Sequence, residues 1–303
     1  MYLLKNLIQI LKLSFCIFLI SATATQSTPT KISILQNIEH PALNATREGF
    51  INELHKLGYK EGENLILDYQ SAQGNATLAA QIAQKFSHDS DLIVAIGTKA
   101  AQAAMTATKE SKIPVVFSSV TDPLAAKLVT NLKAPTGHVT GISNFVAPEP
   151  QFKFFKKCLP SLKRLGIVYD PGEPNSIALN AMMEKAAKEY GLQLVFSAAT
   201  KTSDVLSASQ SLCGKVDAVF VNNDNTALAA FKSVVKAAKD CKIPAFVSDV
   251  DMMDQGAFAA LGPNQFDLGR QTAHLVDTIL KNPEKSLPSV EFPEKTEEYV
   301  ETM

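Results

Sequence analysis

Residues 91–98 (DLIVAIGT) begin a pattern that the chain repeats about 130 residues later, and this repeat decides the expected fold. The first copy has an apolar run of strand length, a turn at Gly97, an alanine-rich segment and then IPVVF at 113–117. The second copy begins with DAVFV at 217–221 and ends with IPAFV at 243–247. Each copy predicts a buried strand, a polar loop that opens a helix, and a second buried strand. We therefore expect two similar lobes with a cleft between them that suits a small molecule.

Strands and helices alternate through both halves of the sequence. Around the first copy, apolar runs at 31–35 and 65–69 alternate with helical patterns at 41–57 and 77–86. The pattern restarts with a strand at 165–169 and continues in the same order through the second copy. Because such alternation produces a parallel sheet covered by helices, the predicted fold class is α/β. We expect two similar lobes, each a parallel sheet with helices on both faces, hinged around a cleft.

The chain is expected to cross between the lobes at least twice. Proline and glycine interrupt the segment 128–148, which predicts the first crossing, and a second is predicted near 248–254. A strand at 257–261 and a helix at 268–280 are then expected to return to the first lobe. The sequence leaves open whether the tail after Pro283 makes a third crossing or is mobile. The predicted division is lobe 1 at 31–143 plus about 252–282, and lobe 2 at 144–251 plus about 286–303.

The first 24 residues differ from the rest of the chain. Lys5 and Lys12 flank or interrupt an apolar stretch that is nearly continuous over 13–20, and Ala22-Thr23-Ala24 has the small residues of a cleavage site. This pattern predicts a signal peptide at 1–24, with cleavage near Ala24. A membrane anchor is the alternative, but the stretch is short of the roughly 20 residues that a spanning helix needs. We therefore expect a periplasmic or otherwise exported protein.

Composition narrows the class of partner. With 303 residues, 46% of them hydrophobic and 19% charged, the chain has enough apolar material for two globular lobes. A net charge of -1 without a large basic block argues against nucleic acid as a partner.

Cys213 and Cys241 each follow a predicted helix in the second repeat, so they could be neighbours. Spacing alone leaves open whether they form a disulfide.

Signatures of catalysis are missing from the sequence. It contains no Walker-type phosphate loop, no GxGxxG after the first strand, no HExxH and no GxSxG. No arrangement of cysteine and histidine resembles a metal site. We expect a protein that is not an enzyme and that uses neither a cofactor nor a metal.

The loops that follow the predicted strands are the candidate site, because ligands of an open parallel sheet bind beyond the carboxyl ends of its strands. Thr98 and Ser176 stand where a hydroxyl can cap a helix or touch a ligand. Asp122, Asp224 and Asp249 are candidates to pair with a ligand ammonium, with a turn or cap role as the alternative for each. The N–H groups at the helix starts are expected to suit an anion such as a carboxylate.

Six short motifs in and around these loops resemble a known family. They are EHPAL at 39–43, QGN at 73–75, VTDP at 120–123, VTGIS at 139–143, YDPGEPNS at 169–176 and DN at 224–225. In this order they are similar to the substrate-binding-protein family of ABC transporters that includes the tryptophan/tyrosine-type binding proteins. The resemblance covers roughly residues 31 to 285.

The resemblance implies a type I periplasmic binding protein, in which a ligand is captured between two lobes and delivered to an ABC permease in the inner membrane. It implies an amino-acid ligand, because characterised relatives are associated with aromatic amino acids. The matched residues implied to contact the ligand are Thr98, Ser119, Thr121, Asp122, Asn175, Ser176, Asp224 and Asn225. Phe117, Phe145, Tyr169 and Phe246 lie near the predicted loops and could surround an aromatic side chain, with core packing as the alternative.

The leading hypothesis is therefore a monomeric, exported solute-binding protein of an ABC importer that closes around an amino acid. A ligand-sensing module that signals through a separate membrane partner is the alternative. An α/β enzyme that uses the same cleft ranks third, because no nucleophile–base pair or cofactor signature supports it.

Overall fold

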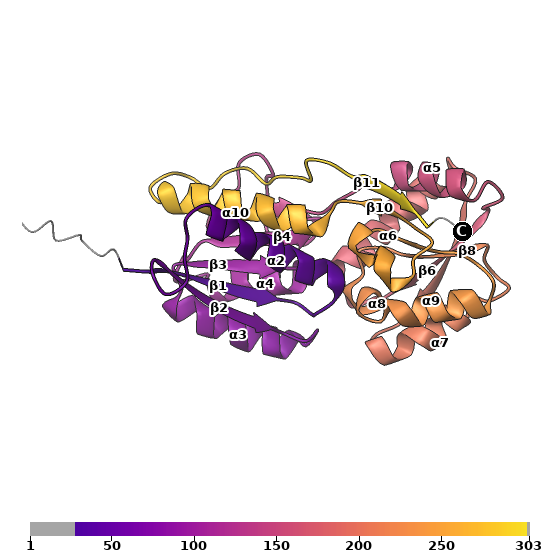
Figure 1. Ribbon diagram of the computed structural model, residues 1–303, viewed down its shortest axis with the longest axis horizontal. Helices are drawn as coiled ribbons and strands as arrows, with labels where there is room; N and C mark the ends of the chain where they lie inside the picture. The colour runs from indigo at the N-terminus through magenta and orange to yellow at the C-terminus, as the bar shows by residue number, and fades with distance from the viewer. Residues whose placement is uncertain (1–27, 302–303) are drawn as a thin grey trace, which may run out of the picture.

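The computed structural model describes residues 28–301, which form two α/β lobes side by side (Figure 1). The first sheet contains five parallel strands in the order β2-β1-β3-β4-β5. These strands are β1 (Thr30–Gln36), β2 (Leu65–Ser71), β3 (Leu92–Ile96), β4 (Val115–Val120) and β5 (Val139–Ser143). The predicted signal peptide at 1–24 lies outside the described residues.

Helices cover both faces of the first sheet. On one face lie α2 (Pro41–Lys56) and α10 (Gln265–Lys281), and on the other lie α3 (Ala76–Asp89) and α4 (Thr98–Ala107). β3 is buried along its whole length, as its continuous apolar sequence predicts for a central strand of a parallel sheet. The first lobe thus has one apolar core on each side of the sheet.

The second sheet contains six strands in the order β11-β10-β9-β8-β6-β7. They are β6 (Arg164–Tyr169), β7 (Gln193–Ala198), β8 (Ala218–Val221), β9 (Ala245–Val247), β10 (Ala259–Gly262) and β11 (Glu297–Val300). Its helices are α5 (Pro148–Cys158), α6 (Pro174–Ala187), α7 (Val205–Gln210), α8 (Asn225–Ala229) and α9 (Phe231–Asp240). The predicted α/β class with two similar lobes is confirmed, except that β11 pairs antiparallel to β10.

One strand lies in a different lobe from the one predicted. The strand expected at 257–261 to return to lobe 1 is β10, which instead pairs with β9 in the second sheet, Ala259 opposite Phe246. A four-residue apolar strand carries no sequence signal for the sheet that it joins, and here it covers the edge that β9 would otherwise expose. The return to the first lobe is made by α10 alone.

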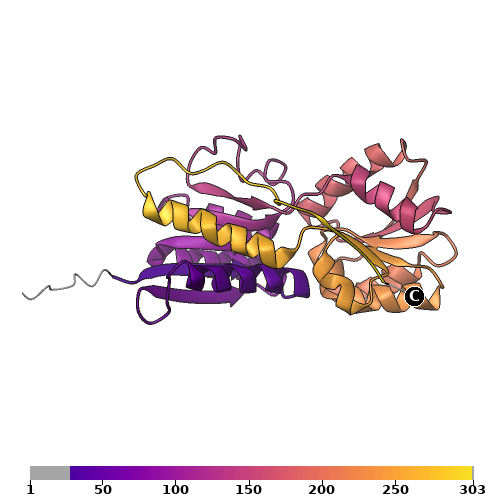
Figure 2. The same cartoon turned by 45° about the horizontal axis from the view of Figure 1, so that its top comes forward.

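The tail after Pro283 makes a third crossing. It runs back along the first lobe and then to β11 in the second sheet (Figures 1 and 2). On the way it pairs with β5, where the Glu291 N–H donates to the Gly141 carbonyl over 3.0 Å and the Ser143 N–H donates to the Glu291 carbonyl over 2.9 Å. Three segments of the described chain therefore connect the lobes.

Among residues 28–301, no helix has both the length and the apolar character that crossing a membrane requires.

Two glycines allow α2 and α10 to pack backbone against backbone. A Cβ atom at Gly49 would lie 2.0 Å from the carbonyl oxygen of Phe266, and one at Gly269 would lie 2.0 Å from that of Thr46. Any larger residue at either position would push the two helices apart. This contact fixes the start of α10, and with it the second crossing, against the first lobe.

Cys213 and Cys241 form a disulfide, with their Cα atoms 5.4 Å apart. The two residues follow α7 and α9, which pack against each other in the second lobe. The possibility that the sequence left open is thus realised in the structure.

We predict that replacing both bonded cysteines by serine will lower the free energy of unfolding by on the order of 3 kcal/mol, because a crosslink 28 residues apart restricts the unfolded chain. Chemical unfolding of the oxidised protein and the double variant measures this. Cys158→Ser, which removes the free thiol, is the matched control and should unfold like the wild type. Equal stability of the double variant and the wild type would contradict the prediction.

Asp251 makes the stability of the second crossing dependent on pH. Its carboxylate accepts the Gln265 N–H over 2.9 Å, and burial, with a smaller contribution from Asp249, raises its pKa from 3.8 to about 7. The folded state therefore holds a proton that the unfolded state releases between about pH 4 and pH 7. In this window the ionisation of Asp251 favours the unfolded state, so the free energy of unfolding falls as the pH rises.

We predict that Asp251→Asn will remove this loss of stability, since asparagine imitates the protonated carboxyl at every pH. Relative to wild type, the variant should gain thermal stability between pH 5 and about pH 8, with little difference near pH 4. Asp254→Asn, an exposed change of the same charge in the same segment, is the control and should keep the wild-type pH profile. Parallel melting curves for Asp251→Asn and wild type across this range would refute the assignment.

Candidate functional site

A small cavity lies between the lobes, beyond the carboxyl ends of the strands in both sheets. Its walls come equally from the two lobes: His40, Leu43, Ser119, Thr121 and Asn144 from the first, and Asn175, Asn223, Asn225, Leu228 and Asp249 from the second. The space left between these side chains is about 10 Å³, roughly what one water molecule needs. The lobes are therefore closed on each other.

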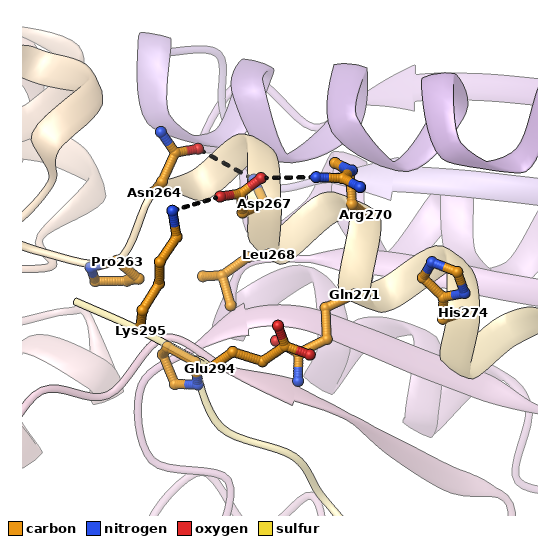
Figure 3. A pocket seen from close by; sticks show the side chains of 10 residues that line it. Pro263, Asn264, Asp267, Leu268, Arg270, Gln271, His274, Glu294 and Lys295 are labelled. Carbon is orange, nitrogen blue, oxygen red and sulfur yellow. Dashed lines mark hydrogen bonds and ion pairs between the residues drawn. The ribbon is translucent and has the colours of Figure 1, made fainter. Parts of the chain in front are cut away.

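A larger pocket of about 300 Å³ lies outside this cleft, between α10 and the C-terminal tail (Figure 3). Its charges neutralise one another within the protein. Asp267 is paired with Arg270 at 3.2 Å and with Lys295 at 3.4 Å, and its backbone N–H donates to the Asn264 side chain. The pocket receives side chains from one lobe and the tail only, so the interlobe cavity remains the candidate site.

His40 contributes from the first lobe as the N-cap of α2. Its Nδ1 accepts the Leu43 N–H at 3.5 Å, so the ring proton lies on Nε2, which faces Asn225 Oδ1 across the cleft at 3.3 Å. Burial lowers the pKa of His40 to about 4. The ring is thus a neutral hydrogen-bond donor at neutral pH.

Ser119 and Thr121 reach the cavity from the end of β4. The register of β4 against β5 shifts between Phe117 and Val120, and Ser119 takes a φ of 55°, which is uncommon for a residue other than glycine. The Ser119 hydroxyl donates to Gln265 Oε1 over 2.7 Å, and the Thr121 hydroxyl donates to Asn144 Oδ1 over 3.2 Å. Both hydroxyl protons are therefore used within the protein.

Glu173 organises the second lobe's side of the site. Its carboxylate is buried and accepts two hydrogen bonds from Asn225, through the backbone N–H at 3.0 Å and through Nδ2 at 2.7 Å. It also accepts from the Thr226 N–H at 3.2 Å, from the Thr226 hydroxyl at 3.2 Å and from Asn175 Nδ2 at 3.0 Å. The N–H groups that open α8 are thus satisfied by Glu173. This corrects the expectation that they would hold a ligand carboxylate.

Two further carboxylates stand behind Glu173. Asp224 caps α8, accepting the Ala227 N–H over 2.8 Å and the Asp170 N–H over 2.6 Å. Burial and then the charge of Glu173 raise the pKa of Asp224 to about 7. Lys99 Nζ approaches Asp170 from the first lobe at 3.9 Å. This wall of the cleft is therefore rich in buried acidic groups, with one lysine facing it from the other lobe.

Gln265 links the site to both lobes at the second crossing. Its Oε1 accepts from the Thr46 hydroxyl at 3.1 Å as well as from Ser119, and its Nε2 donates to Asp249 Oδ1 over 2.5 Å. Asp249 also accepts the Ser248 hydroxyl over 2.8 Å, and burial raises its pKa. The side chains of Ser119 and Asp249 are thus oriented by one fully buried amide.

The structure brings five of the nine predicted residues to the cavity wall: Ser119, Thr121, Asn175, Asn225 and Asp249. The other four lie elsewhere. Asp122 accepts the Leu124 and Ala125 N–H groups of its own turn, and Thr98 is buried at the first position of α4. Ser176 and Asp224 lie buried together behind the wall.

Other residues of the site were not predicted from the sequence. His40 and Asn223 stand in loops that the sequence singled out, and Asn144 follows β5 directly, so position at a strand end could have found them. Glu173 and Gln265 gave no separate signal, because their partners lie far along the chain. Among the aromatic candidates, Phe117 and Phe246 are fully buried in the cores, and Tyr169 packs edge-on against Phe196. Within residues 28–301 no cluster of His, Cys, Asp and Glu suits a metal ion.

Comparisons with known proteins agree with this geometry. The ABC transporter substrate binding protein family matches residues 31–296. A tyrosine-binding protein from Clostridioides difficile is 36% identical over 251 residues, which cover 82% of this chain and 72% of that protein. A Streptococcus pneumonia domain solved in complex with L-Trp is 30% identical with a TM-score of 0.85, over 90% of this chain and 92% of that one.

A second solved structure shows which arrangement the lobes adopt here. It is a ligand-free, open substrate-binding protein with adhesive properties from Clostridium difficile, 37% identical over 89% of this chain and 92% of that one. Its TM-score is 0.67, below that of the L-Trp complex although its sequence identity is higher. The arrangement of the lobes is therefore closer to that of the L-Trp complex than to that of the open structure. The chain belongs to the ABC transporter substrate-binding protein family.

Proposed function

We propose that this protein is the exported solute-binding component of an ABC importer, and that it captures an amino acid, aromatic by preference, between its two closing lobes. The observation that carries the proposal is the composition of the cavity wall, to which each lobe contributes five residues. A ligand held there touches both lobes only when they close, so its binding energy drives closure. Named relatives that bind tyrosine or L-Trp support the choice of ligand.

Ligand entry requires the lobes to separate. The closed cavity has room for about one water, so an amino acid cannot enter it in this form. Two polar contacts that cross the cleft join His40 to Asn225 at 3.3 Å and Lys99 to Asp170 at 3.9 Å. Neither is a short, strong hydrogen bond, and the closed form can therefore yield to an open one at low cost.

The three connecting segments would act as the hinge, and a permease in the inner membrane would read the closed form of a monomeric binding protein. Cleavage near Ala24 would release the protein for this role.

We predict that aromatic amino acids will stabilise residues 25–303 against heat without being consumed. A ligand at 100 times its Kd adds about 2.7 kcal/mol to the unfolding free energy, which a melting experiment resolves readily. Chromatography of the ligand before and after incubation serves as the control for turnover. If no amino acid raised the melting temperature at millimolar concentration, the amino-acid assignment would fail. Consumption of the ligand would point to an enzyme.

Transport itself needs a cellular test. Loss of uptake of a labelled amino acid in cells that lack this protein, restored by the wild type, would support the importer. Binding without any effect on uptake would favour a ligand-sensing module instead.

We further predict that Glu173→Gln will weaken ligand binding at least tenfold and lower the unfolding free energy by about 1–3 kcal/mol. The carboxylate accepts five hydrogen bonds from three residues, and an amide would turn its NH2 group toward some of these donors. Glu149→Gln, an exposed change in α5, is the matched control. Calorimetric titration measures the ligand affinity and chemical unfolding measures the stability. An unchanged affinity would show that Glu173 does not contribute to ligand binding.

A further inference from the structure

The polar atoms of the cavity show which part of a ligand it recognises, starting with Asn175. This side chain lines the cavity and is 4% exposed. Its Nδ2 donates to Glu173 Oε2 over 3.0 Å and to the Asn223 carbonyl over 2.6 Å. A flipped amide would set Oδ1 against these two oxygens, so the orientation is fixed by the network. Among the described residues, Asn175 Oδ1 has no hydrogen-bond partner.

A buried carbonyl oxygen without a partner requires a donor, and several other groups that face the cavity require the same. Of the ten lining residues, Asp249 is the one with an acidic side chain, whose pKa burial raises, and His40 is neutral at neutral pH. Ser119 and Thr121 have used their protons on Gln265 and Asn144, so they present lone pairs to the cavity. Three acceptor side chains and a carboxylate thus converge on one small space.

The same walls offer an anion no positive charge, and their donors are neutral amides such as that of Asn144, whose Oδ1 accepts from Thr121. No arginine or lysine lines the cavity, and Lys99, which faces the acidic wall, is already paired with Asp170. The N–H groups at the start of α8 donate to Glu173. A carboxylate entering this cavity would lose its hydration without gaining a cation, whereas an ammonium group would find several acceptors.

We propose that the cavity recognises its ligand through a protonated primary amine bound by Asn175 Oδ1 and the Asp249 carboxylate, and that the ligand's carboxylate is dispensable. This inference rests on the proposed function, because it concerns the same cleft. It extends the ligand class from aromatic amino acids to aromatic amines without a carboxylate. Asn175 is the residue that determines this specificity.

A matched ligand series on the wild-type protein tests the proposal by calorimetric titration. L-tryptophan, tryptamine and indole-3-propanoate share the ring and differ in the charged groups, and L-tyrosine with its two analogues forms a second series. We expect tryptamine to bind within tenfold of L-tryptophan, and indole-3-propanoate to bind at least a hundredfold more weakly. Binding of the propanoate as tightly as the amino acid, or a hundredfold loss for tryptamine, overturns the inference while the proposed function stands. Failure of every amino acid and amine in both series overturns both.

Asn175→Leu tests the residue itself, because it keeps the size of the side chain and removes the acceptor. Its affinity for L-tryptophan and for tryptamine should fall at least tenfold. Asn180→Leu is the matched control: Asn180 lies on the same helix, is buried, has amide atoms without partners in the described structure, and does not line the cavity. Its affinities should equal those of the wild type. Equal affinities of Asn175→Leu and wild type for both ligands would contradict the assignment of Asn175.

Discussion

The close contact between α2 and α10 is the constraint on which the hinge and the cleft depend. The two helices are more than 200 residues apart in sequence, yet Gly49 and Gly269 let their backbones touch. This fixes the first residue of α10, Gln265, at the boundary between the lobes. From there its amide orients Ser119 in the first lobe and Asp249 in the second. A packing requirement within one lobe thereby sets the geometry of a site that belongs to both.

The second lobe buries several carboxyl groups beside the candidate site, and each of them needs hydrogen-bond donors. Glu173 remains stable there because five donors surround it, and Asp224 because it caps a helix and accepts the Asp170 N–H. Hydrogen bonding offsets part of the loss of hydration that burial imposes on each group, and the remainder raises the pKa of Asp224 to about 7. Two neighbouring atoms remain without a partner, the oxygen of Asn175 at the cavity surface and the Ser176 hydroxyl behind it. The acceptor that the site offers to a ligand is therefore an oxygen that the buried hydrogen bonds leave without a donor.

The sequence predicted the strands and helices better than it predicted which strands pair with one another. The repeat around residues 91–117 and 217–247 identified both lobes, because buried parallel strands have continuous apolar sequences. The assignment of strand 257–261 was wrong, since periodicity reports that a strand is buried and not which sheet it joins. Loops at strand ends predicted the location of the site for the same topological reason.

Individual side chains were harder to predict than loops. Asp122 and Asn175 both stand in polar loops at the cleft end of the sheets, but the oxygen of Asp122 bonds within its own turn. Glu173 contacts residues 52 and 53 positions further along the chain, and no local pattern encodes such a pairing. A loop's composition thus indicates that polar contacts exist, whereas tertiary packing decides which atoms remain for a ligand.

Closure and recognition are coupled through the same groups. His40 is buried in the closed form, where burial lowers its pKa to about 4, so this form disfavours a proton on the ring. An ammonium bound between His40 and the acidic wall would disfavour that proton further, because like charges repel at short range. Ligand binding and lobe closure therefore favour the same neutral state of His40. A cleft built in this way closes more readily around a cation than around an anion, because Glu173, Asp170 and Asp249 place carboxyl oxygens in the buried wall, where an electrostatic interaction is stronger than in water.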